Sequence, residues 1–203
     1  MHLEIYVEEP SAEKALLHLI PAIVGREISF RIHVFQGKSD LLAQLLKRLK
    51  GYRRWLPKDW RIIVLIDADR QDCRKLKADL ERAAQAAGLI THSMAQAAQA
   101  VQVINHIAVE ELEAWFLGDI QALAEAYPGV PPTLGRRADY RDPDAVRGGT
   151  WEALERVLQT AGYYSSGLPK GEAADRIAGH MQPARNRSKS FQVFKQALEA
   201  LIP

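Results

Sequence analysis

The sequence predicts an α/β protein, with a mostly parallel sheet flanked by helices and a helical C-terminal extension. Short apolar runs alternate with segments of helical period through residues 3–117, an order that implies a parallel sheet with right-handed crossovers. The run at residues 62–66 contains no polar residue, as a strand buried on both faces requires. Apolar residues make up 47% of the 203 residues, enough for a continuous core.

The first two predicted strands are separated by one helix. Residues 3–7 form the first strand, and the helix after it begins with Ser11 as its N-cap and stops at Gly25, which tolerates a left-handed conformation. Residues 28–35 alternate apolar and polar side chains, so we expect the second strand near an edge of the sheet.

Two further helix patterns enclose the most apolar strand. A turn at residues 36–40 leads into a helix over residues 41–50, which Gly51 closes. The strand at residues 62–66 follows, and then a helix over residues 73–87 that the next glycine ends. Strand and helix thus alternate regularly, which again indicates parallel strands.

The second half of the chain is predicted to be mainly helical. Residues 101–109 form a strand that runs directly into a helix over residues 110–117, whereas residues 128–149 collect proline and glycine and lose periodicity. Further helical patterns cover residues 151–161, 170–181 and 191–201. The expected organisation is an α/β domain over 1–127, a loop or linker over 128–150, and a helical region over 151–203 packed on the same core.

Composition and charge exclude several classes of protein. The single cysteine, Cys73, excludes an internal disulfide, and the six histidines lack the spacing of a zinc site. The net charge of +2 does not by itself indicate a nucleic-acid ligand. Because no apolar stretch is long enough to cross a bilayer and the first residues are acidic, we expect a cytoplasmic protein without a membrane segment.

Acidic side chains follow three of the predicted strands. Glu8 comes after the first strand, Asp67 and Asp69 follow the apolar strand, and Glu111 and Glu113 follow a later one. The carboxyl ends of parallel strands share one edge of a sheet, so we expect these carboxylates to lie together. Like charges in close contact resist ionisation, and a divalent cation removes that cost. Oxygen ligands select a hard cation, Mg²⁺ or Mn²⁺.

Each acidic segment also has an ordinary structural explanation. Aspartate is common where a strand passes into a turn or a helix cap. Glutamate in the first turn of a helix is favoured by the helix dipole. These preferences account for one or two acids more readily than for their repetition at successive strand ends.

A basic and aromatic segment at residues 47–61 has two interpretations. It holds seven lysines and arginines against one acid, with Tyr52, Trp55 and Trp60 between them. Such a segment binds a nucleic-acid strand through phosphates and stacked bases, or it is a solvated helix end whose tryptophans pack on the core. The candidate nucleic-acid-binding residues are Lys38, Arg48, Arg53, Arg54, Arg185 and Arg187.

The acidic segments also carry a resemblance to known enzymes. They read Val7-Glu8-Glu9-Pro10-Ser11, Asp67-Ala68-Asp69 and Glu111-Leu112-Glu113-Ala114-Trp115. Together they resemble the TOPRIM arrangement shared by topoisomerases, primases and overcoming-lysogenization-defect nucleases. The resemblance implies a TOPRIM/Rossmann-like fold and a residue at Glu8 that acts as acid/base or bridges metals. It also implies metal ligands at Asp67 and Asp69, and a further ligand or support at Glu111 or Glu113.

Two positions depart from the TOPRIM pattern. The usual Glu-Gly turn is Glu8-Glu9 here, so the glycine that allows close backbone approach is missing. The nuclease branch often has a second acid one turn further on, where this chain has Ala12 with Glu13 beside it.

A closer resemblance covers nearly the whole chain. An opening Val-Glu strand, the turn Gln36-Gly37-Lys38, a strand that ends in acid, a Glu-Leu-Glu-Ala-Trp segment and the terminal Ser190-Phe191-Gln192-Val193-Phe194 occur in this order. This combination is similar to the bacterial domain-of-unknown-function family 4276.

These observations lead to three hypotheses about function. The first is a Mg²⁺-dependent phosphodiesterase or nuclease that works with an ATPase partner in bacterial defence or DNA processing, as the resemblance suggests. The second is a non-catalytic module on the same fold that binds nucleic acid or a protein. The third is a small-molecule phosphatase or nucleotide-binding enzyme, because one scaffold supports several activities.

Overall fold

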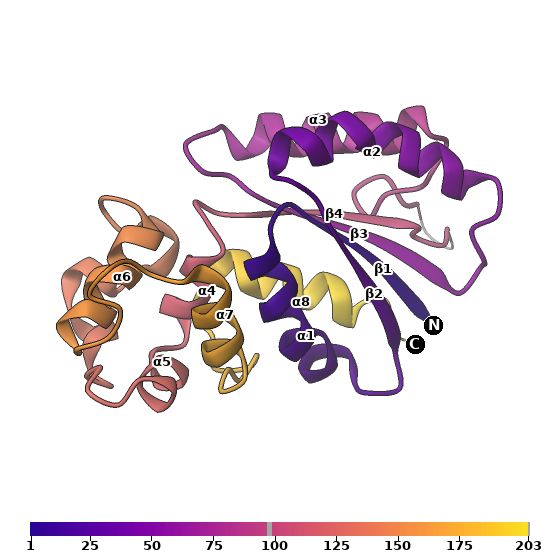
Figure 1. Ribbon diagram of the computed structural model, residues 1–203. Coiled ribbons are helices and arrows are strands. Elements are labelled where there is room, and N and C mark those ends of the chain that lie inside the picture. The colour runs from indigo at the N-terminus through magenta and orange to yellow at the C-terminus, as the bar shows by residue number, and fades with distance from the viewer. Residues whose placement is uncertain (97–98, 203) are drawn as a thin grey trace.

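The computed structural model describes residues 1–96 and 99–202, and the strands of these residues form one sheet between layers of helices (Figure 1). The strands are β1 (His2–Val7), β2 (Ser29–Val34), β3 (Trp60–Asp67) and β4 (Val103–Ala108). They pair in the order β2-β1-β3-β4, and each pair is parallel. The predicted α/β class is therefore confirmed, and β2 lies at an edge as its alternating pattern indicates.

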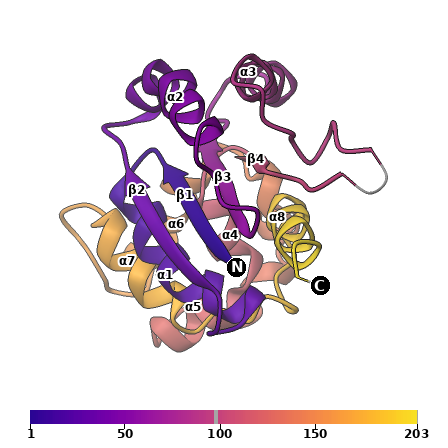
Figure 2. The ribbon, with the colours of Figure 1, turned by 90° about the vertical axis from the view of Figure 1, so that its right-hand side faces the viewer.

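Helices cover both faces of the sheet (Figure 2). On one face lie α1 (Pro10–Val24) and α8 (Lys189–Glu199), and on the other α2 (Lys38–Arg53) and α3 (Cys73–Ala86). Successive side chains of a strand point to opposite faces. On β1, Leu3 and Ile5 therefore pack under α1 and α8, whereas Tyr6 packs under α2 and α3.

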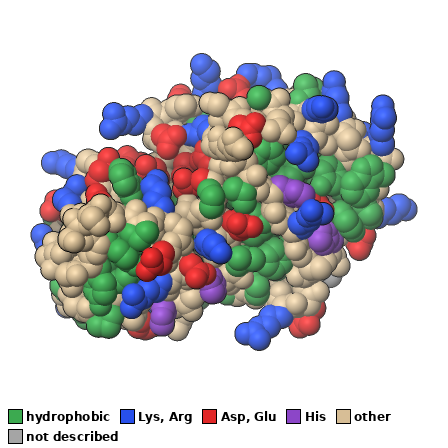
Figure 3. Space-filling view, in the orientation of Figure 1, with side chains coloured by type: hydrophobic (Ala, Val, Ile, Leu, Met, Phe, Trp, Pro, Cys, Tyr) green, Lys and Arg blue, Asp and Glu red, His purple; other side chains and the backbone are tan. Residues whose placement is uncertain are grey.

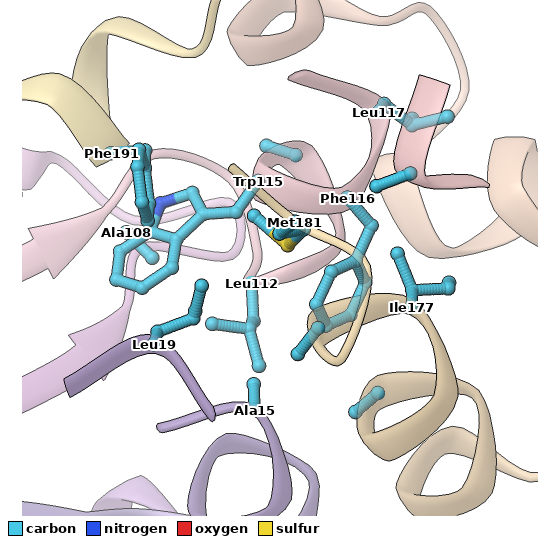
Figure 4. Close-up of a cluster of buried hydrophobic side chains, with 14 of the residues drawn as sticks. Ala15, Leu19, Ala108, Leu112, Trp115, Phe116, Leu117, Ile177, Met181 and Phe191 are labelled. Carbon is cyan, nitrogen blue, oxygen red and sulfur yellow. The ribbon is translucent and has the colours of Figure 1, made fainter. Parts of the chain in front are cut away.

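The remaining helices gather beside the carboxyl ends of the strands, on the left in Figure 1. They are α4 (Glu113–Gly118), α5 (Ile120–Ala126), α6 (Thr150–Thr160) and α7 (Lys170–Ala178). Figure 4 shows Trp115 and Phe116 of α4 in one cluster with Leu19 of α1 and Ile177 of α7. The sheet and the C-terminal helices thus share a continuous core.

Several element boundaries differ from the sequence predictions. Glu9 rather than Ser11 occupies the N-cap of α1, and the Ser11 hydroxyl donates a hydrogen bond to the Glu9 carboxylate. α2 begins at Lys38 and continues through Gly51, because buried leucines on each turn outweigh the roughly 1 kcal/mol that a helical glycine costs. Short 3₁₀ turns interrupt the predicted loop at residues 128–149.

Over the described part of the chain, no helix combines the length and the apolar character needed to cross a bilayer.

Candidate functional site

Acidic side chains from three strand ends meet at the carboxyl edge of the sheet. Glu8 follows β1, Asp67 ends β3, and Glu113 opens α4 shortly after β4. The backbone N–H of Asp67 donates a hydrogen bond of 2.7 Å to the Glu8 carboxylate. We call Glu8, Asp67, Asp69 and Glu113 the acidic rim. Figure 3 shows acidic side chains, in red, gathered where the sheet meets the C-terminal helices.

Burial raises the pKa values of three carboxyl groups of the acidic rim, those of Glu8, Asp67 and Glu113. Glu8, Asp67 and Glu113 are only 9%, 8% and 1% exposed. Burial, and then the charges of Glu8 and Glu113, hold the pKa of Asp67 well above its usual range. Burial raises the pKa of Glu113 to about 7 despite the attraction of Lys170, and burial also raises the pKa of Glu8. Close, desolvated like charges are the condition that a bound cation relieves.

Two lysines pair with the acidic rim. Lys38, the first residue of α2, places its Nζ 2.5 Å from Asp69 Oδ2. Lys170, the first residue of α7, places its Nζ 3.7 Å from Glu113 Oε1 and 5.1 Å from the centre of the Trp151 ring. Burial alone would lower the pKa of Lys170, but Glu113 and the neighbouring acids raise it above its usual range. The rim is therefore a mixed cluster of carboxylates and ammonium groups.

Lys170 is a site residue that the sequence analysis missed. The chain between α6 and α7 has no periodic pattern that would indicate where it leads. One signal was present, because a lysine in the first turn of a helix opposes the positive end of the helix dipole. A residue in that position needs a compensating negative charge, and Glu113 supplies it.

Unlike Glu113, Glu111 has its carboxylate engaged by the start of α6. Its Oε2 accepts a hydrogen bond of 3.0 Å from the Thr150 hydroxyl and one of 2.9 Å from the Trp151 backbone N–H. These donors belong to the first turn of α6. Glu111 therefore caps α6 from a distant part of the chain.

The loops after β3 and β4 have unusual backbone conformations. Asp69 and Glu110 have φ values of 50° and 58°, in the left-handed region. The Asp69 N–H donates a hydrogen bond of 2.6 Å to the Glu110 carbonyl, which ties the two loops together. Asp69, Glu110, Glu111 and Glu152 line a hollow of about 520 Å³ here, together with Arg70. Such backbone outliers collect at functional sites more often than elsewhere.

The donor atoms of the acidic rim suit a hard divalent cation. They are carboxylate oxygens, and the buried Oε2 of Glu113 has no hydrogen-bond partner among the residues that the structure describes. Within residues 1–96 and 99–202, no group of three or more His, Cys, Asp or Glu side chains is arranged to hold a metal ion on its own. Mg²⁺ usually binds one or two carboxylates and completes its shell with water and substrate phosphate. The carboxylates of the rim are the residues that could hold such an ion.

The candidate nucleic-acid-binding residues of α2 lie at its two ends. Lys38 is only 10% exposed and is engaged with Asp69 at the acidic rim. Arg48 and Arg53 belong to the opposite end of the helix, and Arg54 follows it; all three are exposed. Blue side chains line the upper border of Figure 3, over α2 and α3.

Arg185 and Arg187 make contacts within the C-terminal region. The Nε of Arg185 lies 2.7 Å from Oδ1 of the buried Asp119, and its Nη1 donates to Gln121. Arg187 donates to several backbone carbonyls, those of Gly135, Tyr140 and Arg141. Both guanidinium groups therefore hold the loop before α8 against neighbouring segments.

Comparisons with known proteins identify the family. A comparison with curated proteins and one with solved structures each give no match to this chain. One family model matches residues 7–201, which is nearly the whole length and includes both the acidic rim and the terminal Ser-Phe-x-x-Phe helix. The chain belongs to the family described as domain of unknown function (DUF4276).

Proposed function

We propose that this protein is a Mg²⁺- or Mn²⁺-dependent phosphodiesterase that cleaves nucleic acid at the acidic rim. The observation that carries the proposal is the burial of Glu8, Asp67 and Glu113 together, although they lie far apart in the sequence. Placing these carboxylates beside one another costs folding free energy unless a cation joins them. An arrangement that is costly for folding and that places oxygen donors at the carboxyl edge of a sheet favours a functional explanation.

The residues of the rim divide into ligands and groups that contact substrate. Asp67 and Asp69 are the proposed metal ligands. Glu113 is a further donor through its Oε2, which has no partner within residues 1–96 and 99–202. When bound, Mg²⁺ or Mn²⁺ polarises a phosphate and lowers the pKa of a water. The hydrogen bond from the Asp67 N–H holds the Glu8 carboxylate beside a proposed metal ligand. From this position Glu8 would hold or move the proton of the attacking water.

The two lysines extend the site toward the phosphates of a substrate. Lys38 and Lys170 are cations at the border of the rim, on the first turns of α2 and α7. In a complex they donate hydrogen bonds to phosphate oxygens and exchange their carboxylate partners for substrate. Both are therefore positioned to orient the scissile phosphate.

Incubation with labelled single-stranded DNA, double-stranded DNA and RNA tests the proposed cleavage. We expect cleavage with Mn²⁺, none with chelator, and a loss of at least a hundredfold in Asp67→Asn, because a metal ligand is removed. Asp139→Asn, a change on the exposed turn before residue 140, serves as the matched control. Cleavage that survives Asp67→Asn would reject the assignment of the site.

One observation favours a second candidate, a non-catalytic binding module on the same fold. Lys38 and Lys170 already neutralise Asp69 and Glu113 in part without a metal. Glu9 and Ala12 also replace residues that the TOPRIM nucleases use. The same incubation separates the candidates. A binding module would bind the nucleic acid both in chelator and in Mn²⁺ and would leave it uncut.

An ATPase partner and a role in bacterial defence or DNA processing rest on the TOPRIM resemblance alone. We extend the proposal to them, with the cytoplasm as the location of the complex. Co-purification of the tagged chain with an ATPase encoded beside its gene tests the partner. A chain that elutes alone from such a co-expression would count against it.

A further inference from the structure

An aromatic surface remains open to solvent at the end of α2. Trp55, two residues after the end of α2, is 56% exposed. Its ring lies 5.0 Å from that of Tyr52, tilted by 35°, and 5.6 Å from that of Trp60, nearly perpendicular at 75°. Trp55 is thus held by its neighbours, and about half of the side chain stays available for a ligand.

The exposed ring borders a concave, basic hollow. The hollow has a volume of about 420 Å³ and is lined by one side of α2 and the turn after it. Its lining residues are Gln44, Lys47, Arg48, Gly51, Tyr52 and Trp55. None of these is acidic, and Lys47 and Arg48 are exposed, so an anion that enters the hollow meets positive charge from the helix.

We propose that this hollow binds single-stranded nucleic acid, with a base stacked on Trp55 and phosphates held by Lys47 and Arg48. A flat ring beside cations suits a ligand that has both a planar face and negative charge. Bases within a duplex are already stacked, so an unpaired strand is the form of nucleic acid that fits. Single-stranded nucleic acid is then the substrate class of the proposed nuclease. Binding at the hollow does not depend on that activity, and only cleavage of the bound strand rests on the proposed function.

The position of α2 links the hollow to the acidic rim. Lys38 opens the helix beside Asp69, and Arg53 ends it near Trp55. A helix of this length spans about 24 Å, which corresponds to about seven nucleotides at the 3.4 Å rise of a stacked strand. A single strand anchored at Trp55 therefore reaches the acidic rim along α2.

Fluorescence anisotropy with labelled oligo-dT and oligo-U of about 16 nucleotides, a length at the upper end of single-strand site sizes, tests the inference. The titrations are made in EDTA, so that cleavage plays no part. We expect both oligonucleotides to bind, and Trp55→Ala to raise the Kd about tenfold through loss of one stacked base. Arg48→Ala should raise the Kd severalfold and reduce the slope of log K against log salt by about 0.7.

Matched variants and ligands separate stacking from charge. Val193→Ala removes a comparably exposed apolar side chain from α8, and Arg26→Ala removes an exposed arginine from the turn after α1; neither should alter the Kd. Inorganic polyphosphate of equal charge should respond to Arg48→Ala but not to Trp55→Ala. An unchanged oligonucleotide Kd in Trp55→Ala would overturn the subsite. Tight binding to anionic phospholipid vesicles in place of oligonucleotides would overturn it as well.

The two proposals fail in different ways. Oligonucleotides that bind in EDTA with the expected Trp55 dependence, but are never cut in Mn²⁺, would reject the nuclease and keep the subsite. Oligonucleotides that are cut in Mn²⁺ and bind Trp55→Ala as tightly as the unmodified protein would do the reverse.

Discussion

At the residue scale, the acidic rim depends on the balance between burial and neighbouring charge. Glu113 is almost completely buried. Lys170 approaches one of its oxygens, and the other accepts no hydrogen bond from the described part of the chain. A carboxylate in this position is stable as a neutral acid, as the partner of a cation, or as a metal ligand. Which state prevails depends on pH and on the cation present, and this dependence can be measured.

Glu113→Gln should change how stability depends on pH. The pKa of Glu113 rises from 4.5 to about 7 on folding, so its protonation stabilises the fold fully below pH 4.5 and the contribution is lost as pH rises through 7. At pH 8 in chelator, Glu113→Gln should be more stable than the unmodified protein, with a free energy of unfolding up to about 3 kcal/mol larger. At pH 4.5 the two should be similar.

Urea unfolding at the two pH values measures this difference. Glu27→Gln, which changes an exposed glutamate after α1, serves as the control. An equal loss of stability at both pH values in Glu113→Gln would contradict the account. It would mean that the ionised carboxylate is required for packing rather than unfavourable.

At the element scale, several charged groups of the site are the first residues of helices. α2 and α7 each begin with a lysine beside the rim, and α4 begins with Glu113. α6 begins at Thr150, whose hydroxyl binds Glu111. The packing of these helices on the common core therefore decides which side chains converge, and a change at a helix start affects the site as well as the fold.

Glu111→Ala should destabilise α6 rather than remove a metal ligand. It takes away the acceptor of the Thr150 hydroxyl and of the Trp151 N–H, and the loss of such a cap costs about 1 kcal/mol, up to about 2. Urea unfolding should show this decrease, whereas Glu111→Gln retains an oxygen acceptor and should lose less. Mn²⁺ affinity that disappears in Glu111→Gln while stability is unchanged would show that Glu111 is a ligand instead.

The strands and the larger helices could be predicted because their patterns are local. The apolar run of β3 and the alternation of β2 follow directly from their positions in the sheet. α5 was not predicted, because seven residues are too few for a helical period to stand out. Its N-cap, Asp119, was a usable signal, since this side chain accepts a hydrogen bond from the Ala122 N–H.

At the scale of the whole molecule, one core joins the sheet to the C-terminal helices. Phe191 of α8 is fully buried, and its ring lies 5.2 Å from that of Trp115 in α4. The same cluster contains side chains of β1, and Figure 4 shows its members from α1, β4 and α7. Residues on both sides of the long loop at 128–149 therefore stabilise each other, and the protein should unfold as one cooperative unit.

Phe191→Ala tests this cooperativity. Truncation of a buried phenylalanine should lower the free energy of unfolding by about 3–5 kcal/mol. Far-UV circular dichroism and tryptophan fluorescence should report the same urea midpoint as each other in the unmodified protein, and should again coincide, at a lower urea concentration, in the variant. Two separated midpoints would show that the α/β part and the helical region are independent domains.

The site was only partly predictable, for reasons of long-range geometry. The convergence of Glu8 with Asp67 follows from parallel strands that share an edge, and the structure places the Asp67 N–H on the Glu8 carboxylate. The contact of Lys170 with Glu113 depends instead on how an irregular segment returns to the rim. The different roles of Glu111 and Glu113 depend on where α6 begins, which no local pattern around residue 111 records.

The central claim is that acids from distant strand ends share a divalent cation at the acidic rim. Crystals soaked in MnCl₂ and measured for anomalous scattering test it most directly. The account predicts a manganese peak within about 2.0–2.6 Å of carboxylate oxygens from Asp67 and at least one other acid of the rim, and no such peak in Asp67→Asn. A fully soaked crystal with no manganese at the rim, or with the same peak in both proteins, would contradict it.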